Sequence, residues 1–244
     1  MARTRTRPPA GLDRRAPASE RIGRIMRRLK KAYADARVGL RFTTPLECLV
    51  ATILSAQSTD ARVNLVTQTL FQKYRTPEDY LKVPEEELQR DIQSTGFFRQ
   101  KTRAIRGSCR MLIERFDGQV PRSMKELIEL PGVARKTANI VLGNSYPEIA
   151  HKDPGTGIAV DTHVGRVAVR LGLTTRGSKE AEKIERDLMA LVPARDWYQT
   201  SYLFIEHGRR VCDAKRPRCG ECSVELLCPS SQDAGLPDLY RTTR

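Results

Sequence analysis

The segment TPLE at residues 44–47 combines the usual signals for the start of an α-helix. Thr44 can cap the helix, Pro45 suits its first position, and Glu47 can complete a capping box. Similar signals recur at four further positions, Thr59, Thr76, Ser123 and Ser178. Strict apolar/polar alternation never extends beyond about four residues, and the chain has no Asn-Gly hairpin signal. The sequence therefore predicts an all-α fold.

The two ends of the chain differ in composition from the helical middle. Residues 1–18 are rich in Arg, Pro and Ala and poor in apolar side chains, which predicts a disordered basic arm. From Ser19, a candidate cap, apolar residues follow on one face of a helix whose other faces are cationic. The polar segment 230–244 is expected to be a disordered tail, and the Pro- and Gly-rich stretch 146–157 a loop between helical lobes.

Lysine and arginine number 43 against 29 acidic residues, a formal net charge of +14. Such a charge favours polyanionic partners, nucleic acid above all, although an arginine-rich surface without a ligand is the alternative. The chain has no apolar run of about 18 residues, and nothing near its amino terminus resembles a signal peptide. Pro8, Pro9 and Pro17 argue against an amphipathic organellar presequence. We therefore expect a cytoplasmic protein.

Six cysteines are unevenly distributed. Cys48 and Cys109 lie alone in helical patterns and are expected to be small buried side chains. The others follow the spacing C-x6-C-x2-C-x5-C, namely Cys212, Cys219, Cys222 and Cys228. In a chain without an export signal, this spacing favours metal ligation over a disulfide pair. Tetrahedral zinc and a [4Fe-4S] cluster both take four thiolates, so the ligand count leaves the metal open.

The loop between the first two of these cysteines is cationic. Its sequence, DAKRPR, contains Lys215, Arg216 and Arg218. Metal ligation would stiffen the loop, so that these side chains could bind DNA phosphates at a smaller cost in ordering entropy. They are therefore candidate DNA-binding residues.

Residues 123–146 are predicted to form two helices joined by the tight turn LPGVA at residues 130–134. This is the pattern of a helix-hairpin-helix. Gly132 allows close approach of the backbone. The free amides that follow Ala134, at the start of the second helix, can bind a DNA phosphate oxygen without reading the base sequence.

Charged residues near this turn have two possible roles. Arg135 and Lys136 follow the turn directly, and either could bind a phosphate. Lys136 could instead act as a nucleophile, a role that a lysine can take when its amine is neutral. Further along, Asp161 in AVDTHVGRV could serve only as the N-cap of a helix or could take part in catalysis.

Three motifs in this order resemble those of the endonuclease III family. They are the hairpin LPGVARKTAN at residues 130–139, the segment VDTHVGRV at 160–167 and the cysteine spacing given above. The segment LSAQSTD at 54–60 matches the same family. The similarity extends from about residue 20 to residue 229 and leaves only the two ends uncovered.

The resemblance implies a bifunctional DNA glycosylase and abasic-site lyase of base excision repair. Such an enzyme removes oxidised pyrimidines from double-stranded DNA and then cleaves the strand by β-elimination. By the same resemblance, Lys136 is the nucleophile that forms a Schiff base, and Asp161 stabilises charge on the sugar. The spaced cysteines hold a [4Fe-4S] cluster rather than zinc. The protein is expected to act as a monomer on damaged or abasic DNA in the bacterial nucleoid.

The family resemblance also implies two helical lobes flanking a DNA-binding cleft. A six-helix barrel lobe that contains the helix-hairpin-helix is expected at residues 38–148. The cluster lobe is expected to combine residues 19–37 with residues 149–229.

A damaged base cannot be reached inside the duplex, so the nucleotide must be flipped out and the gap must be filled. The resemblance assigns that task to Gln57 and Phe97. The family more usually has leucine in place of Phe97, and a core aromatic is the alternative interpretation of this residue. Ala134 is a second departure, because the hairpin pattern often repeats glycine there.

Two other functions fit parts of the pattern. Mismatch-specific adenine glycosylases share the aspartate and the cluster, but they generally lack the lysine and carry an extra carboxyl-terminal domain. Here Lys136 is present, and only sixteen residues follow Cys228. A DNA-binding paralogue without catalysis would keep the cluster for docking or redox sensing, but nothing in the motifs indicates such a loss.

Overall fold

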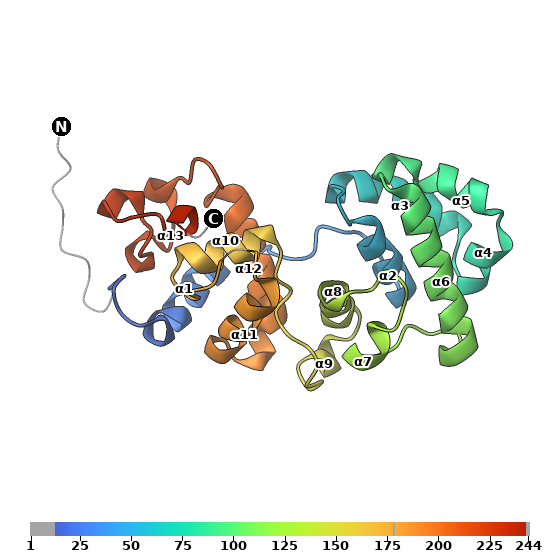
Figure 1. The fold of residues 1–244 in the computed structure, drawn as a ribbon, viewed down its shortest axis with the longest axis horizontal. Helices are drawn as coiled ribbons and strands as arrows, with labels where there is room; N and C mark the ends of the chain where they lie inside the picture. Colours follow the sequence, from blue (N-terminus) through green and yellow to red (C-terminus); the bar gives the residue numbers. More distant parts are fainter. Residues whose placement is uncertain (1–12, 178, 243–244) are drawn as a thin grey trace. The chain divides into compact units, whose positions relative to one another are not determined.

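The computed structural model of the protein describes residues 13–177 and 179–242 (Figure 1). Within these residues no strand occurs, and the predicted all-α fold is confirmed. They divide into two compact units. The hairpin unit runs from Val38 to Ala159, and the cysteine unit combines the described residues up to Arg37 with those from Val160 onward. Most of the predicted basic arm lies outside the described residues.

The hairpin unit, every residue of which is described, contains eight α-helices. In chain order they are α2 (Pro45–Leu54), α3 (Asp60–Lys73), α4 (Pro77–Lys82), α5 (Glu85–Ile92), α6 (Phe98–Phe116), α7 (Met124–Leu127), α8 (Arg135–Ser145) and α9 (Pro147–Ala150), with the 3-10 helix η1 (Gln93–Thr95) between α5 and α6. Two of the eight, α7 and α9, have only four residues, so six longer helices form the body of the unit. A backbone N–H three residues on donates to each of the predicted caps Thr44, Thr59, Thr76 and Ser123.

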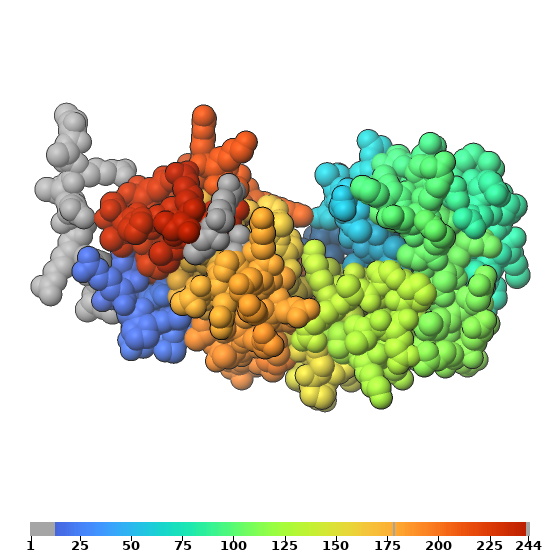
Figure 2. Space-filling view, in the orientation of Figure 1, coloured from blue at the N-terminus to red at the C-terminus, as the bar shows by residue number. Residues whose placement is uncertain are grey.

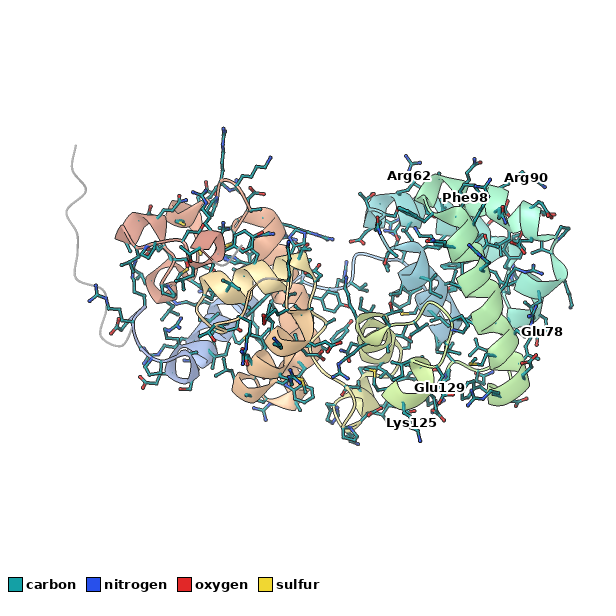
Figure 3. The ribbon with its side chains drawn as sticks, in the orientation of Figure 1. Arg62, Glu78, Arg90, Phe98, Lys125 and Glu129 are labelled. Carbon is teal, nitrogen blue, oxygen red and sulfur yellow. The ribbon has the colours of Figure 1, made fainter. Side chains whose placement is uncertain are left out.

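Apolar packing holds the hairpin unit together. Leu49 of α2 and Leu127 of α7 are fully buried or nearly so. Cys48 and Cys109 are also buried, which confirms the interpretation of these cysteines as small core side chains. Figure 2 shows the outer surface of α3 to α6, coloured cyan to green, and charged side chains such as Arg62 project from this surface (Figure 3).

The boundary between the units differs from the predicted one. The sequence assigns residues 149–159 to the cluster lobe, whereas the structure includes them in the hairpin unit. Hydrogen bonds explain the difference. Asp153 Oδ2 accepts the Met124 N–H at the start of α7 at 2.6 Å, and the Gly157 N–H donates to Asn139 Oδ1 of α8 at 2.9 Å. The composition of a Pro- and Gly-rich loop does not reveal such bonds.

The described part of the cysteine unit forms five α-helices and four 3-10 helices. They are α1 (Ala18–Ala32), α10 (Thr162–Arg170), α11 (Ala181–Leu191), η2 (Ala194–Asp196), α12 (Trp197–Arg210), η3 (Cys219–Glu221), η4 (Glu225–Leu227), η5 (Gln232–Ala234) and α13 (Leu239–Thr242). Ser19 does not cap α1, because Pro17 takes the N-cap position and no side-chain cap forms. The candidate cap Ser178 lies outside the described residues.

The prediction of a disordered tail at residues 230–244 is wrong for its described part. Asp238 Oδ2 lies 3.1 Å from Arg170 Nη2 of α10, and the two side chains are 10% and 3% exposed. Tyr240 of α13 is buried, and the Arg170 guanidinium lies 5.0 Å from the centre of its ring. A buried guanidinium is costly unless its charge and N–H groups are satisfied, and the tail supplies a carboxylate that its polar composition does not indicate.

Among the described helices, none combines the length and the apolar character needed to cross a lipid bilayer.

Candidate functional site

The turn between α7 and α8 is a tight hairpin. Gly132 has a φ of 78°, and a Cβ there would lie 2.6 Å from the Cβ of Ala104 in α6, so that only glycine fits. A Cβ on Gly107 of α6 would in turn meet the Pro131 ring at 3.0 Å. The Ser108 hydroxyl donates to the Pro131 carbonyl at 2.8 Å. Small residues of α6 therefore allow the turn to pack closely against that helix. The predicted helix-hairpin-helix is confirmed.

The start of α8 has no side-chain cap. Ala134 is its N-cap residue, with extended backbone angles, and alanine has no side-chain acceptor to offer. The first N–H groups of a helix have no intrahelical acceptor, and they lie at the positive end of the helix dipole. Because Ala134 is also exposed, this end of α8 is suited to an external anion such as a phosphate.

Arg135 and Lys136 open α8 and differ in their surroundings. Arg135 is half-buried, and its Nη1 donates to the Gly155 carbonyl at 2.8 Å, which ties the 151–157 loop to the hairpin. Lys136 is exposed, and its side chain makes no hydrogen bond or ion pair with any described residue. Its amine is therefore available to a ligand, whereas Arg135 already has a structural contact.

Asp161 is the N-cap of α10. Its Oδ1 accepts the backbone N–H groups of His163 and Val164, both at 2.8 Å. Its Oδ2 has no hydrogen-bond partner among the described residues, and the side chain is half-buried. The capping role is thus present, and it occupies only one of the two carboxylate oxygens. Asp161 belongs to the cysteine unit, whereas Lys136 belongs to the hairpin unit.

Gln57 and Phe97 share an unusual backbone conformation. Their φ angles are 53° and 48°, in the left-handed region that side chains other than glycine seldom adopt. Gln57 is exposed and follows α2, while Phe97 precedes α6 and is 55% exposed. The alternative interpretation of Phe97 as a core aromatic is therefore wrong.

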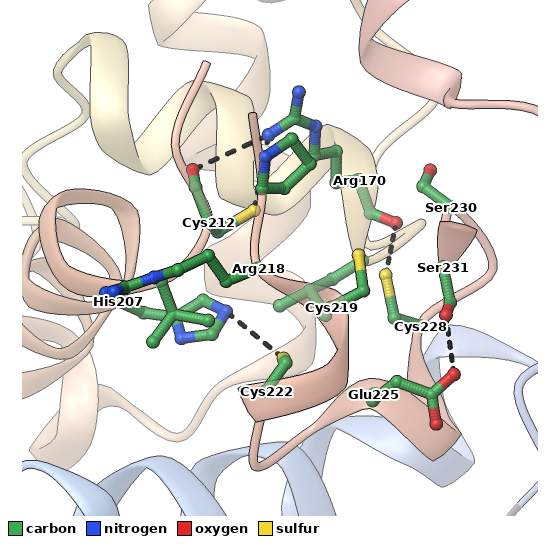
Figure 4. Close-up of a pocket in the computed structure, with 13 residues that line it drawn as sticks. Arg170, His207, Cys212, Arg218, Cys219, Cys222, Glu225, Cys228, Ser230 and Ser231 are labelled. Atoms are coloured by element: carbon green, nitrogen blue, oxygen red, sulfur yellow. Dashed lines mark hydrogen bonds between the residues drawn. The ribbon is translucent and has the colours of Figure 1, made fainter. Parts of the chain in front are cut away.

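The predicted metal ligands line one pocket of the cysteine unit, together with Arg170 of α10 and His207 of α12 (Figure 4). All four cysteines in this pocket are free thiols. Arg170 Nη1 lies 3.5 Å from Cys212 Sγ, and His207 Nε2 lies 3.7 Å from Cys222 Sγ. The structure thus brings the spaced cysteines together and places a side-chain nitrogen beside two of them.

Burial disfavours the thiolate form in this pocket. It raises the pKa of Cys222 to about 12 and also raises the pKa of Cys228. Burial raises the pKa of Cys212 as well, and the Arg170 guanidinium opposes part of that rise. Thiols of this kind stay protonated at neutral pH unless a bound metal replaces the proton.

His207 lies between Cys222 of this pocket and Tyr33, which follows α1. Burial lowers its pKa to about 4, so the ring is neutral at neutral pH. The Tyr33 hydroxyl lies 2.9 Å from Nδ1, while Nε2 faces Cys222. A hydroxyl that donates to Nδ1 would leave the ring proton on Nε2, where it can be donated to the sulfur.

The Asp213 side chain orders the cationic loop that follows Cys212. Asp213 Oδ1 accepts the N–H groups of Lys215 and Arg216 at 2.8 and 3.1 Å. Both side chains are exposed, and neither has a polar partner among the described residues. They are therefore available to an anion.

Arg218, the third cation predicted in this loop, is engaged within the protein. Its Nε lies 3.5 Å from a carboxylate oxygen of Glu221, and its Nη2 donates to the Arg210 carbonyl. Because the Arg218 side chain is still exposed, these contacts do not close it off from solvent.

Comparison with known proteins places the chain in a family. Residues 50–194 match a family model described as HhH-GPD superfamily base excision DNA repair protein. Endonuclease III of Synechocystis sp. is 48% identical over 221 residues, which are 91% of this chain and 97% of that relative. The chain belongs to the endonuclease III family. Endonuclease III of Bacillus subtilis is likewise 48% identical, over 82% of this chain and 88% of that protein.

Two solved structures from the endonuclease III family share this fold. One is a non-covalent endonuclease III–DNA complex, with a TM-score of 0.81 and 42% identity, which covers 90% of this chain and 99% of that chain. The other is a trapped covalent endonuclease III–DNA intermediate, with a TM-score of 0.82 and 41% identity, over 90% of this chain and 100% of that chain. The similarity therefore includes most of both units.

Sequence reasoning missed two side chains beside the thiols of this endonuclease III family member. Arg170 lies within the apolar run AVRLGL, and an arginine in such a run could have indicated a buried cation with a fixed partner. His207 is held by the Tyr33 hydroxyl on its other ring nitrogen. Its proximity to Cys222 had no local signal, because the two residues are fifteen positions apart.

Proposed function

We propose that this member of the endonuclease III family is a bifunctional DNA glycosylase and abasic-site lyase. It removes oxidised pyrimidines from double-stranded DNA in base excision repair, acting in the bacterial nucleoid. One observation carries the proposal: the chain matches endonuclease III over 91% of its length and keeps an exposed lysine, Lys136, directly after the hairpin turn. A related endonuclease III, 41% identical, was trapped as a covalent intermediate with DNA.

Lys136 supplies the nucleophile in this proposal. Its neutral amine attacks the anomeric carbon of the flipped nucleotide, the bond from that carbon to the base breaks, and the base leaves with a proton. The sugar ring then opens: the bond from the anomeric carbon to the ring oxygen breaks, that oxygen takes a proton, and the nitrogen keeps one hydrogen as it forms the C=N bond of a protonated Schiff base. The iminium draws electrons from the adjacent carbon, so loss of a proton there expels the 3′ phosphate. Water then hydrolyses the Schiff base and frees Lys136.

Asp161 is the proposed carboxylate that stabilises positive charge on the sugar and helps to move the lysine proton. The way it caps α10 supports this role. Both N–H groups bind Oδ1, and Oδ2 has no partner among the described residues. One side chain can therefore hold its helix and still offer an oxygen for chemistry.

The remaining predicted residues are proposed to hold DNA. The amides that follow Gly132 and Ala134 bind a backbone phosphate, while Gln57 and Phe97 fill the space left by the flipped nucleotide. Further phosphate contacts are assigned to four cations, Arg135, Lys215, Arg216 and Arg218. Among these, Arg135 and Arg218 can offer only the N–H groups that their contacts within the protein leave over.

We propose a [4Fe-4S] cluster as the cofactor. Four free thiols around one pocket fit it, because each iron takes one thiolate. In the described residues, no three Cys, His, Asp or Glu side chains gather closely enough for a single metal ion, and a cluster does not require that closeness. Arg170 and His207 would donate N–H groups to its sulfur ligands. Bound there, the cluster would cross-link η3 and η4 to the end of α12 and stiffen the cationic loop.

The proposed function is tested with a duplex that contains one thymine glycol. Wild-type protein should release the base and leave the β-elimination product. Replacement of Lys136 by glutamine should lower both reactions on the order of 10³-fold or more, because the nucleophile is lost. Lys125→Gln, an exposed lysine on the first helix of the same hairpin, is the matched control and should retain full activity. Intact base and strand after incubation with wild-type protein would overturn the proposal.

Asp161→Asn separates the capping role from the chemical role of this residue. Asparagine caps helices as well as aspartate does, so thermal stability should change little. The rate of base release should fall on the order of 10²-fold, because the negative charge is gone. A variant that loses stability and rate in parallel would restrict Asp161 to its structural role.

A further inference from the structure

Lys101 is a buried lysine that the proposed chemistry does not use. It lies in the first turn of α6, and its side chain is only 4% exposed. The ammonium donates to two carbonyl oxygens, that of Leu54 at 2.7 Å and that of Thr95 at 2.8 Å. Burying a charge is costly unless its hydrogen bonds are made, so these contacts are strongly required by the fold.

The two carbonyls belong to the two turns that carry Gln57 and Phe97. Leu54 is the last residue of α2, three positions before Gln57, and Thr95 ends η1, two positions before Phe97. The backbone N–H of Lys101 also donates to the carbonyl of Phe97 itself, at 3.1 Å. Lys101 therefore holds both turns at once, one through its side chain alone and the other through both side chain and backbone.

Both turns need such support. In the described chain only three residues other than glycine have a positive φ, and two of them are Gln57 and Phe97. This conformation costs about 1–3 kcal/mol at each residue and persists only where the surroundings impose it. The end of a helix also leaves carbonyls without intrahelical donors, and Leu54 carries one of them. The ammonium satisfies that carbonyl and connects it to the neighbouring turn.

We infer that Lys101 is a positioning residue that fixes the Gln57 and Phe97 turns in one arrangement, with both side chains ready to enter the DNA base stack. The inference rests on the proposed function, because it assumes that these side chains fill the gap left by a flipped nucleotide. Their exposure agrees with it, since neither side chain must leave the core to reach DNA. The two turns are then already ordered when the protein folds, so binding to DNA does not carry the entropic cost of ordering them.

A second cation of the same helix provides a matched control. Arg106 of α6 donates to the carbonyls of Tyr80 and Val83 at the end of α4, at 2.9 and 2.7 Å. Like Lys101, it holds carbonyl oxygens at the end of a neighbouring helix. Its hydrogen bonds go to carbonyls of residues 80–83 and not to the Gln57 turn or the Phe97 turn. Lys101→Met and Arg106→Met therefore both remove a carbonyl-binding cation from α6, and only Lys101→Met should affect insertion into DNA.

The test uses full-length protein and a duplex with a non-cleavable abasic-site analogue beside 2-aminopurine, whose fluorescence reports unstacking. Stopped-flow mixing gives the rate constant of insertion without any chemical step. Lys101→Met should lower this rate constant about tenfold or more, while Arg106→Met should stay within about twofold of wild type. Lys101→Gln, which keeps N–H donors, should fall between them. Thermal unfolding of all variants checks that the comparison is made between folded proteins.

Equal insertion rates for Lys101→Met and Arg106→Met would overturn the inference and leave Lys101 with a purely structural role. If Lys101→Met does not fold, Lys101→Gln is tested in its place. The inference then requires that the insertion rate constant of Lys101→Gln be lower than that of Arg106→Met. A failure of the proposed function would be seen separately, because the wild-type protein would then neither release thymine glycol nor cleave the strand. An active wild type with unaffected insertion in the lysine variants would refute only the role of Lys101.

Discussion

In the hairpin unit, apolar packing holds the elements around Lys136, whereas in the cysteine unit hydrogen bonds from buried arginines hold the elements around the thiols. The hairpin turn rests on α6 through direct contacts between small residues, such as Gly132 against Ala104. The segment of the thiols, residues 212–228, instead contains two three-residue 3-10 helices, η3 and η4, joined by turns. Short 3-10 turns have poor hydrogen-bond geometry and little area to bury, so the segment depends on side chains from other elements.

Buried arginines supply much of that support. Arg21 of α1 donates to the carbonyls of Leu171 and Leu227, at 2.6 and 2.8 Å. Arg166 of α10 donates to the Cys212 carbonyl at 3.1 Å. Each guanidinium can bind several carbonyls because it presents five N–H donors. The hairpin unit can therefore hold its site without a cofactor, while the cysteine unit is built around polar groups that a metal cluster would complete.

The largest expected effect is the loss of the cluster. Cys219→Ser should destabilise the cysteine unit by on the order of 5 kcal/mol or more, since a structural metal contributes its binding free energy to folding. Hydrogen exchange with mass spectrometry should show lost amide protection in α10 and α12, with protection in α2 and α6 retained. Equal loss of amide protection in both units would contradict the claim that only the cysteine unit depends on the cluster.

A core truncation in the hairpin unit comes next. Leu127 of α7 is 0% exposed, and Leu127→Ala should lower the free energy of unfolding by about 2–5 kcal/mol through lost burial and a cavity. Leu65→Ala, at a leucine that is 62% exposed on α3, should change it by less than about 0.5 kcal/mol. Urea denaturation measures both variants. A similar small change at the two positions would contradict an apolar core that holds the hairpin.

The tail contact tests the arginine support of the cysteine unit. Asp238→Asn keeps an acceptor for Arg170 but removes the charge, and it should lower stability by about 2 kcal/mol. Asp35→Asn is the comparison, because Asp35 pairs with Arg210 at the surface, where such pairs contribute little. In thermal unfolding, the Tm of the Asp238 variant should be well below the Tm of the Asp35 variant. The reverse ranking would mean that the tail does not stabilise the unit.

The smallest effect is expected at a helix cap of the hairpin unit. Backbone N–H groups of Arg75 and Thr76 hold the pKa of Asp79 below its usual range. Such a carboxyl stabilises the fold above its unfolded pKa of about 3.9, and the stabilisation is lost as pH falls through the lower folded pKa. Asp79→Asn should therefore cost less than about 1 kcal/mol at neutral pH and still less near pH 2. An equal difference in Tm at both pH values would refute this.

The local signals of the sequence predicted much of the fold. The caps at Thr44, Thr59 and Thr76, the hairpin turn and the grouping of the four cysteines all depend on residues close together in the chain, so spacing alone could indicate them. The capping boxes are an example, because both of their hydrogen bonds join residues three positions apart.

The features that the sequence did not predict depend on partners far apart in the chain. Asp238 pairs with Arg170, 68 positions away, and a polar composition therefore concealed an ordered tail. Lys101 binds the carbonyl of Leu54, 47 positions away, although the segment RQKTR suggests an exposed helix start. Composition indicates whether a segment can be buried, but it does not indicate which distant residue pairs with a charged side chain of that segment.

The most direct test of the central claim is to locate the covalent bond to DNA. Wild-type protein is incubated with DNA that contains thymine glycol in the presence of borohydride, digested with a protease, and analysed by mass spectrometry. If Lys136 is the nucleophile, a reduced sugar adduct should be found on the peptide that contains Lys136, and no adduct should form with Lys136→Gln. An adduct on another residue, or none from wild-type protein that still releases the base, would contradict that role.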